Sequence, residues 1–506
     1  MLKNIYRWHR LLSLIIALPL VLSAGSGIMH PIMTNIRPSV VTQGLRPEPI
    51  DSARVLLALA TTLDSGQIDS FYRARLVHID TNWFYQVQRN QGDVPLYISA
   101  RTGKVLPRGD WLYAQYLARI FLEGARSAQR AGPSMGASTP TMPDCCNAAT
   151  ASVLCAPGAK VKDEVRLADF DDEYNEVNRV LPVYRVSFNR PDGIRIYVET
   201  LQDRFAFAVD NRRASFNRVF EYIHTYQWLD FLGKGRLVVE FLLIFTAFLT
   251  TVLGVWIFFS TRSKKVKGNA YVSARRNHRY TAIVISLFTA MFTFSGAYHA
   301  IYKLKDTKHY VAPTQERFAS GSLRIGLRTL GSATGGAIAG FRPVWLEGKI
   351  YWQVMIGQRA ALEGFRYIPN GTGPALANGD SLYAIDLAGR FSNRNAGDIV
   401  SVRPITRFDD KYNFADKLLP VWEVTYKDGV HPRYFIETSS GRLSVRADDW
   451  DIVEGYSFAL LHKHEFLGWL GKPVKDFSTV FWALAQILLV ALGLMLYFRS
   501  RQRRKK

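Results

Sequence analysis

Three pairs of histidines are the first candidates for chemistry, because both members of each pair hold the same place in two similar stretches. One kind of stretch reads "HRLLSLIIALPLVLSAGSGIMH" (9–30) and "HRYTAIVISLFTAMFTFSGAYH" (278–299), the other "FEYIHTYQWLDFLGKG" (220–235) and "FALLHKHEFLGWLGKP" (458–473). The pairs are His9 with His278, His30 with His299, and His224 with His462. Imidazole is an axial ligand of haem iron, and iron held by two imidazoles keeps no open position, which suits electron transfer.

The spacing of these histidines predicts where such sites would lie. His9 and His30 are 21 residues apart, as are His278 and His299, and this spans roughly 31 Å of helix, so each pair marks opposite faces of a membrane. Two halves packed about a pseudo-twofold axis would bring matching histidines together. We expect about two haem groups per chain. Each would be haem b, because no C-x-x-C-H motif is present for covalent attachment. One would lie between His9 and His278.

The outer site has more than one possible set of ligands. The sequence leaves open whether it uses His30 with His299, His224 with His462, or all four. The expected iron ligands are therefore His9, His278, His30, His299, His224 and His462.

Four apolar runs must position these histidines. They are roughly Leu11–Met29, Leu237–Phe259, Thr281–Ile301 and Thr479–Phe498. Each approaches the ~20 residues that about 30 Å of hydrocarbon requires. The sequence therefore predicts four membrane spans, the first of them retained because no convincing signal-peptide cleavage site follows it.

The basic residues predict the orientation. The chain has a net charge of +22, and much of it lies in "MLKNIYRWHR", "TRSKKVKGNAYVSARRNHR" and "RSRQRRKK", each beside an apolar run. Membrane topology explains these clusters better than nucleic-acid binding, because basic loops stay on the cytoplasmic side. We expect both termini in the cytoplasm and the two long segments outside.

The long segments also match each other, which predicts an internal duplication. "DFDDEYNEVNRVLPVYRVSF" (169–188) resembles "RFDDKYNFADKLLPVWEVTY" (407–426), and "WFYQV" (83–87) lies over "IYWQV" (350–354). We also align "LYISARTGK" (96–104) with "LYAIDLAGR" (382–390). These registers place an insertion at about 106–165, with an amphipathic helix followed by a loop that contains Cys145, Cys146 and Cys155.

The predicted fold is a four-span helical bundle with two outer α+β domains, whose alternating apolar residues indicate antiparallel sheets. The expected spans are 1–33, 237–260, 278–301 and 474–498, and the outer domains are 34–236 and 302–473. A basic cytoplasmic loop (261–277) and tail (499–506) complete the chain.

The spans and their flanks resemble the PepSY-associated transmembrane family. The resemblance is carried by "RWHRLLSLIIALPLVLSAGSGIMH" with its copy at 276–299, and by "IHTYQWLDFLGKG" with its copy "LHKHEFLGWLGKP". It implies a bacterial inner-membrane protein with PepSY-like periplasmic domains. It also implies haem b and the reduction of ferric siderophores, or another ferric chelate, in the periplasm for iron uptake.

No flavin or nicotinamide module is visible in the sequence. The glycine-rich "GSATGGAIAG" (331–340) falls in an outer domain, and no G-x-G-x-x-G opens a helix after a strand. We therefore expect electrons from a separate cytoplasmic reductase or from quinol.

Two other functions compete with a reductase. PepSY-type domains also suit a membrane-anchored regulator or binding protein without enzymatic activity, and a transporter for iron or a siderophore is a further alternative. A transport path needs polar residues inside the spans, where only mild ones such as Ser26 and Gln486 occur.

The remaining candidates favour structural roles. "FDD" at 170–172 and 408–410 reads as a turn or cap, His464 and His309 as solvated loop residues, and the cysteines as a disulfide with one thiol left over.

Overall fold

The computed structural model describes residues 2–40, 49–130, 160–175, 180–262, 269–304, 316–357, 364–409, 411–412 and 417–505. The three cysteines, His309 and Asp410 lie outside these residues. The chain divides into two compact units, each built from segments distant in sequence. The first contains 1–37, 212–309 and 449–506, and the second contains 38–211 and 310–448.

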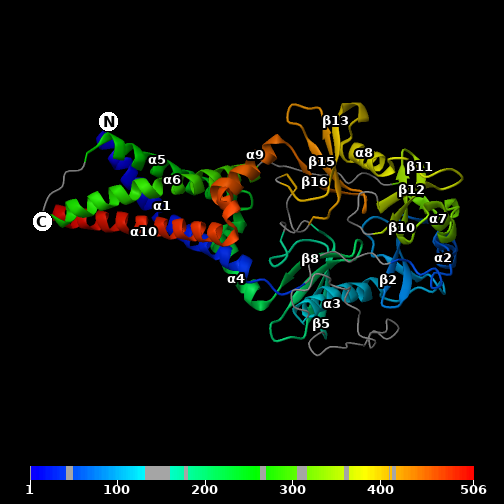
Figure 1. Ribbon diagram of the computed structural model, residues 1–506. Coiled ribbons are helices and arrows are strands. Elements are labelled where there is room, and N and C mark those ends of the chain that lie inside the picture. Colours follow the sequence, from blue (N-terminus) through cyan, green and yellow to red (C-terminus); the bar gives the residue numbers. More distant parts are fainter. Residues whose placement is uncertain are drawn as a thin grey trace. The chain divides into compact units, whose positions relative to one another are not determined.

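The first unit is built around four long helices. They are α1 (Leu2–Asn35), α5 (Gly235–Ser260), α6 (Ala270–Leu304) and α10 (Lys472–Lys505). All four are long and apolar enough to cross a membrane, as predicted. Both termini of the chain lie at the same end of this bundle (Figure 1). The protein is thus a multi-pass membrane protein.

Shorter helices complete the other end of the bundle. They are α4 (Asn211–His224), η2 (Gln227–Leu232), α9 (Asp449–Ser457), η6 (Phe458–His462) and η7 (Glu465–Leu470). The compact unit therefore includes 212–236 and 449–473, which the sequence analysis assigned to the outer domains. These segments join the bundle because their aromatic and histidine rings pack on α1 and α6.

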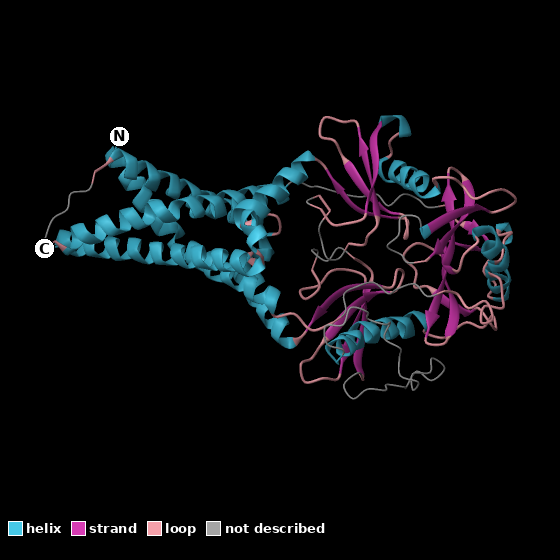
Figure 2. Cartoon of the chain, in the orientation of Figure 1, coloured by secondary structure: helices cyan, strands magenta, loops and turns pink. Residues whose placement is uncertain are grey.

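The second unit contains the strands, shown in magenta in Figure 2. Its first segment forms two antiparallel sheets, in the orders β2-β3-β4 and β5-β6-β7-β8. The strands are β2 (Arg73–Ile79), β3 (Asn82–Gln88), β4 (Leu96–Ser99), β5 (Val161–Leu167), β6 (Val183–Phe188), β7 (Arg195–Glu199) and β8 (Arg204–Val209). Helix α3 (Gly109–Arg130) packs on β4 and on β6 to β8, and α2 (Leu59–Ser65) lies N-terminal to the strands.

The second segment has sheets of the same orders, β10-β11-β12 and β13-β14-β15-β16. The strands are β10 (Ile338–Leu346), β11 (Lys349–Ile356), β12 (Phe365–Pro369), β13 (Ile399–Ile405), β14 (Val421–Tyr426), β15 (Arg433–Glu437) and β16 (Arg442–Ala447). Helix α8 (Gly379–Ser392) packs on β12 and on β14 to β16. The short elements are β1 (Ser70–Phe71), paired with β9 (Phe318–Ala319), together with η3 (Ser320–Ser322), α7 (Leu327–Thr334) and η5 (Ala396–Asp398).

The two α+β segments share a hydrophobic core. Phe71 and Leu76 from the first segment pack in one cluster with Phe318, Phe341 and Trp352 from the second. Two reciprocal ion pairs join the four-stranded sheets: Arg204 to Glu437 at 3.0 Å and Arg442 to Glu199 at 2.6 Å. The outer segments are therefore parts of one folded unit, and their origin by internal duplication stays a prediction.

One alignment from the sequence analysis is wrong. Residues 96–99 form strand β4, whereas 382–390 lie within helix α8. The structural counterparts are Tyr97 in β4 and Tyr367 in β12, whose hydroxyls donate to Asp110 at 2.9 Å and Asp380 at 2.8 Å. Helix α3 thus corresponds to α8, so the extra residues of the first segment fall after this helix and before β5.

Candidate functional site

The packing of the four long helices determines which histidines can meet. Helix α1 packs against α5 and α10, and α6 packs against the same two helices. Helices α1 and α6 therefore occupy opposite corners of the bundle. Their first histidines, His9 and His278, lie at the end that carries both chain termini.

Each of these two histidines lies against a glycine of a neighbouring helix. A Cβ placed on Gly254 of α5 would lie 3.1 Å from Nε2 of His9, and one on Gly493 of α10 would lie 3.5 Å from Cε1 of His278. His9 and His278 are near enough for their charges to interact. Nδ1 of His278 is buried, with no hydrogen-bond partner in the part of the chain described. A free imidazole nitrogen and neighbouring glycines suit the axial ligation of a bulky planar group, because glycine permits close backbone approach.

At the other end of the bundle, two serines orient His224 and His462. Oγ of Ser26 lies 3.0 Å from Nδ1 of His224, and Oγ of Ser295 lies 3.2 Å from Nδ1 of His462. The Ser26 hydroxyl donates to the Leu22 carbonyl at 2.7 Å, so its oxygen can accept a hydrogen bond from the imidazole N–H. A hydrogen bond at one ring nitrogen fixes the tautomer and leaves the other available to a metal.

The rings of His224 and His462 face each other at a separation suited to one iron between them. Their centroids are 6.4 Å apart and their planes meet at 78°. A metal–imidazole bond is about 2 Å, so two opposed imidazoles on one metal have centroids about 6 Å apart. These residues therefore fit a bis-histidine haem.

His30 and His299 flank this pair instead of facing each other. The ring of Phe220 contacts the rings of both His30 and His224, with centroid distances of 6.0 and 4.7 Å. The ring of Phe458 likewise contacts those of His299 and His462, at 4.9 and 4.8 Å. Nδ1 of His299 also bonds to Glu454. Of the two outer pairs, the structure thus brings only His224 and His462 into ring contact among the residues described.

His224 and His462 are neutral at physiological pH because burial lowers their pKa values. Burial lowers the pKa of His224 to about 4. Burial also lowers the pKa of His462 to about 3, with further lowering by the charge of His224. A neutral imidazole at physiological pH has the lone pair that iron ligation requires.

His464 differs from its sequence expectation. It was expected in a solvated loop, but it is fully buried, with rings of Phe288 and Phe292 5.4 and 5.0 Å away. Its Nδ1 lies 3.0 Å from Oγ of Ser478. Tyr226 holds the matching position in the first half, and both residues have left-handed backbones that open a 3-10 helix. This short helix directs His464 against Phe288 and Phe292 instead of into solvent.

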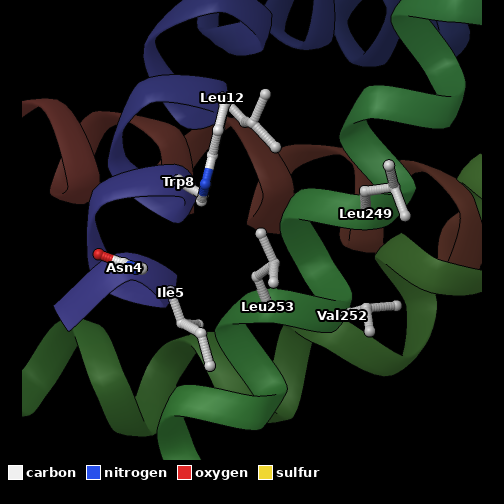
Figure 3. A pocket seen from close by; sticks show the side chains of 7 residues that line it. All are labelled: Asn4, Ile5, Trp8, Leu12, Leu249, Val252 and Leu253. Atoms are coloured by element: carbon white, nitrogen blue, oxygen red, sulfur yellow. The ribbon is translucent and has the colours of Figure 1, made fainter. Parts of the chain in front are cut away.

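A small apolar groove lies beside His9. It has a volume of about 310 Å³ and is lined by Asn4, Ile5, Trp8 and Leu12 of α1 and by Leu249, Val252 and Leu253 of α5 (Figure 3). Trp8 precedes His9 and Leu253 precedes Gly254 in the chain. The groove therefore lies between the same turns of α1 and α5 that carry His9 and Gly254.

The first aspartate of each "FDD" segment caps local backbone, in agreement with the predicted turn or cap. Oδ1 of Asp171 accepts the backbone N–H of Tyr174 at 2.7 Å, and Oδ1 of Asp409 accepts that of Tyr412 at 2.8 Å. These aspartates therefore cap local backbone.

Comparison with known proteins places the whole chain in one family. The family model described as "PepSY-associated TM region" matches residues 6–501. No curated protein matches the chain. Because the match includes all four long helices and both α+β segments, the chain belongs to the PepSY-associated transmembrane family.

Proposed function

We propose that this protein is a haem b-containing inner-membrane reductase that carries electrons to ferric iron, held in a siderophore or another ferric chelate, in the periplasm. The observation that carries the proposal is the 6.4 Å pairing of His224 with His462. The placement of His9 and His278 at the other end of the same bundle, each beside a glycine of a neighbouring helix, supports it.

The two histidine pairs define two levels in the bundle. His9 and His278 would hold one haem, and His224 and His462 the other. Ser26 is 17 residues beyond His9 in α1, which corresponds to about 25 Å of helix. The outer pair, which bonds to Ser26 and Ser295, thus lies nearer to the inner pair than His30 and His299 do.

Haem iron supplies one-electron chemistry when it is bound. The chain's own residues orient the ligands and exclude water. Ser26 and Ser295 fix the outer imidazoles by hydrogen bonds. Gly254 and Gly493 leave space beside the inner imidazoles. Between the two levels, Phe288 stacks on Trp482 at 3.7 Å. Reduction of Fe(III) weakens its binding by hard oxygen ligands, so one electron can release chelated iron.

The basic segments support the direction of transfer. They flank the ends of the helices where His9 and His278 lie, and basic flanks are retained in the cytoplasm. Electrons would then arrive at His9 and His278 from a cytoplasmic reductase or from quinol. They would leave on the periplasmic side.

The activity can be tested with the purified full-length protein. The protein is reduced with dithionite, freed of excess reductant and mixed with a ferric siderophore under nitrogen, while an Fe(II)-specific chromogenic chelator traps the product. We expect haem oxidation and Fe(II) formation at one electron per haem. A His224→Ala protein that still reduces the chelate as fast, or a wild-type protein that stays reduced, would refute the proposal.

A further inference from the structure

The second unit contains two copies of one hydrogen-bonded network, and only one copy is complete. In the first copy, Nε of Arg75 donates to Gln86 at 2.6 Å and Nη2 donates to the Thr200 carbonyl at 2.7 Å. In the second, Nε of Arg342 donates to Gln353 at 2.6 Å and Nη2 to the Thr438 carbonyl at 2.6 Å. The two arginines are therefore held in the same way.

The first copy neutralises its arginine with a carboxylate. Arg75 makes a paired contact with Asp203, with nitrogen–oxygen distances of 2.7 and 2.6 Å. The hydroxyl of Tyr113 also donates to Asp203. Such a two-pronged contact between guanidinium and carboxylate is among the stronger polar contacts in proteins.

The second copy has no carboxylate at this place. Gly441 lies three residues after Thr438, as Asp203 lies three residues after Thr200, and both have left-handed backbones with φ of 70° and 56°. A Cβ on Gly441 would lie 2.9 Å from the hydroxyl of Tyr383 and 3.6 Å from Nη2 of Arg342. The donors that correspond to those around Asp203 are thus present without their acceptor.

Arg73 adds to the unbalanced positive charge. It begins β2, which packs against β10, the strand that contains Arg342 (Figure 1). Arg442 begins β16 and follows Gly441, whose Cβ position lies 3.6 Å from Nη2 of Arg342. Arg442 pairs with Glu199, but no carboxylate contacts Arg73 or Arg342 in the described residues. Burial, and then the charge of Arg342, lowers the pKa of Arg73 to about 10, as expected for neighbouring like charges.

We propose that Arg73, Arg342, Arg442 and Tyr383, here called the arginine cluster, bind a carboxylate of a small organic anion. The ligand's carboxylate would take the place that Asp203 fills in the first copy, accepting from the guanidinium of Arg342 and the hydroxyl of Tyr383. The three arginines are only partly buried, so a dissolved anion can reach them. A planar carboxylate matches the guanidinium fork, and the first copy already shows this geometry.

The test is calorimetric titration of the full-length protein in detergent with sodium citrate, and with phosphate and chloride at matched ionic strength. We expect saturable binding of citrate, a tenfold or greater loss of affinity in Arg342→Gln, and no binding in Gly441→Asp, which supplies the carboxylate from the chain itself. Gly429→Asp is the matched control, because Gly429 is exposed with open space around it, and it should bind citrate like the wild type.

Three results would overturn the proposal. They are citrate heats no larger than those of chloride, phosphate binding as tight as citrate binding, and undiminished citrate binding in Arg342→Gln. Thermal unfolding supplies a second measurement: Gly441→Asp should melt at a higher temperature than the wild type without citrate, and citrate should raise the melting temperature of the wild type and of Gly429→Asp but not of Gly441→Asp. These readouts do not depend on haem, so their failure leaves the proposed reductase function untouched.

Discussion

His224 and His462 face each other with their ring centres 6.4 Å apart, although they belong to helices that precede different membrane spans. Each is tied by its Nδ1 to a serine of another span, Ser26 or Ser295. The bundle thus builds one site from four segments that are far apart in sequence. This relationship separates the outer histidines into a facing pair and a flanking pair.

The first prediction follows from that separation. His224→Ala or His462→Ala should each remove the same haem, because loss of either axial ligand leaves the iron with one imidazole. His30→Ala and His299→Ala should retain it, since their rings contact Phe220 and Phe458 and make no ring contact with each other among the residues described. Haem content per chain from the visible spectrum is the measurement. Loss of the haem in His30→Ala with retention in His224→Ala would reverse the assignment.

The second prediction concerns the glycines beside the inner pair. Gly254→Val and Gly493→Val should each lower the content of the inner haem, because a side chain there would occupy space next to His9 or His278. Gly25→Val in α1 is the control, since a Cβ at that position meets nothing within 4 Å. Equal haem content in all three variants would show that these glycines have no role at the site.

The third prediction concerns the buried ion pair of Arg204 and Glu437, whose side chains are 6% and 2% exposed. Glu437→Gln should cost about 3–5 kcal/mol of unfolding free energy, because it leaves a buried charge unpaired. Asp51→Asn breaks the exposed pair with Arg54 and should cost less than about 1 kcal/mol. Both losses of unfolding free energy can be measured by denaturant unfolding of the second unit, monitored by tryptophan fluorescence. Equal costs would contradict the prediction.

The fourth prediction is a pH dependence at Glu164. Burial raises the pKa of this carboxyl from 4.5 to about 8. A raised carboxyl pKa means that the folded state binds the proton more tightly than the unfolded state. The contribution of Glu164 to the free energy of unfolding therefore falls as pH rises from about 4.5 to 8. Glu164→Gln should therefore gain stability relative to the wild type across this window, on the order of 1 kcal/mol.

Melting temperatures of the wild type and Glu164→Gln, measured between pH 5 and pH 8, check this prediction. The melting temperature of Glu164→Gln should exceed that of the wild type by an amount that grows with pH. Asp163→Asn removes a charge from the adjacent, exposed position and serves as the control. A difference that shrinks with pH, or one that Asp163→Asn reproduces, would count against it.

The four long helices could be predicted from the sequence for a physical reason. A membrane helix needs an uninterrupted apolar run, so all four spans could be read directly. His9 and His278 could be paired because their flanking letters repeat. The choice between His30 with His299 and His224 with His462 could not be made, since it depends on how these rings pack against one another and against Phe220 and Phe458.

Two predictions that depended on short stretches of sequence were wrong. "LYISARTGK" and "LYAIDLAGR" share letters, but their structures differ because Tyr97 belongs to a strand and Tyr383 to a helix. His464 reads as a loop residue beside charged neighbours, and its burial arises from packing against α6 and α10. The missing carboxylate at Gly441 becomes visible only when Arg75 and Arg342 are compared in three dimensions.

The most direct test of the account is the visible spectrum of the full-length protein, purified from haem-replete membranes, before and after dithionite. The account predicts b-type bands on reduction and about two haems per chain. It further predicts that His9→Ala and His278→Ala each lose the same one while His224→Ala loses the other. A colourless wild-type protein, or His9→Ala and His278→Ala proteins that lose different haems, would contradict it.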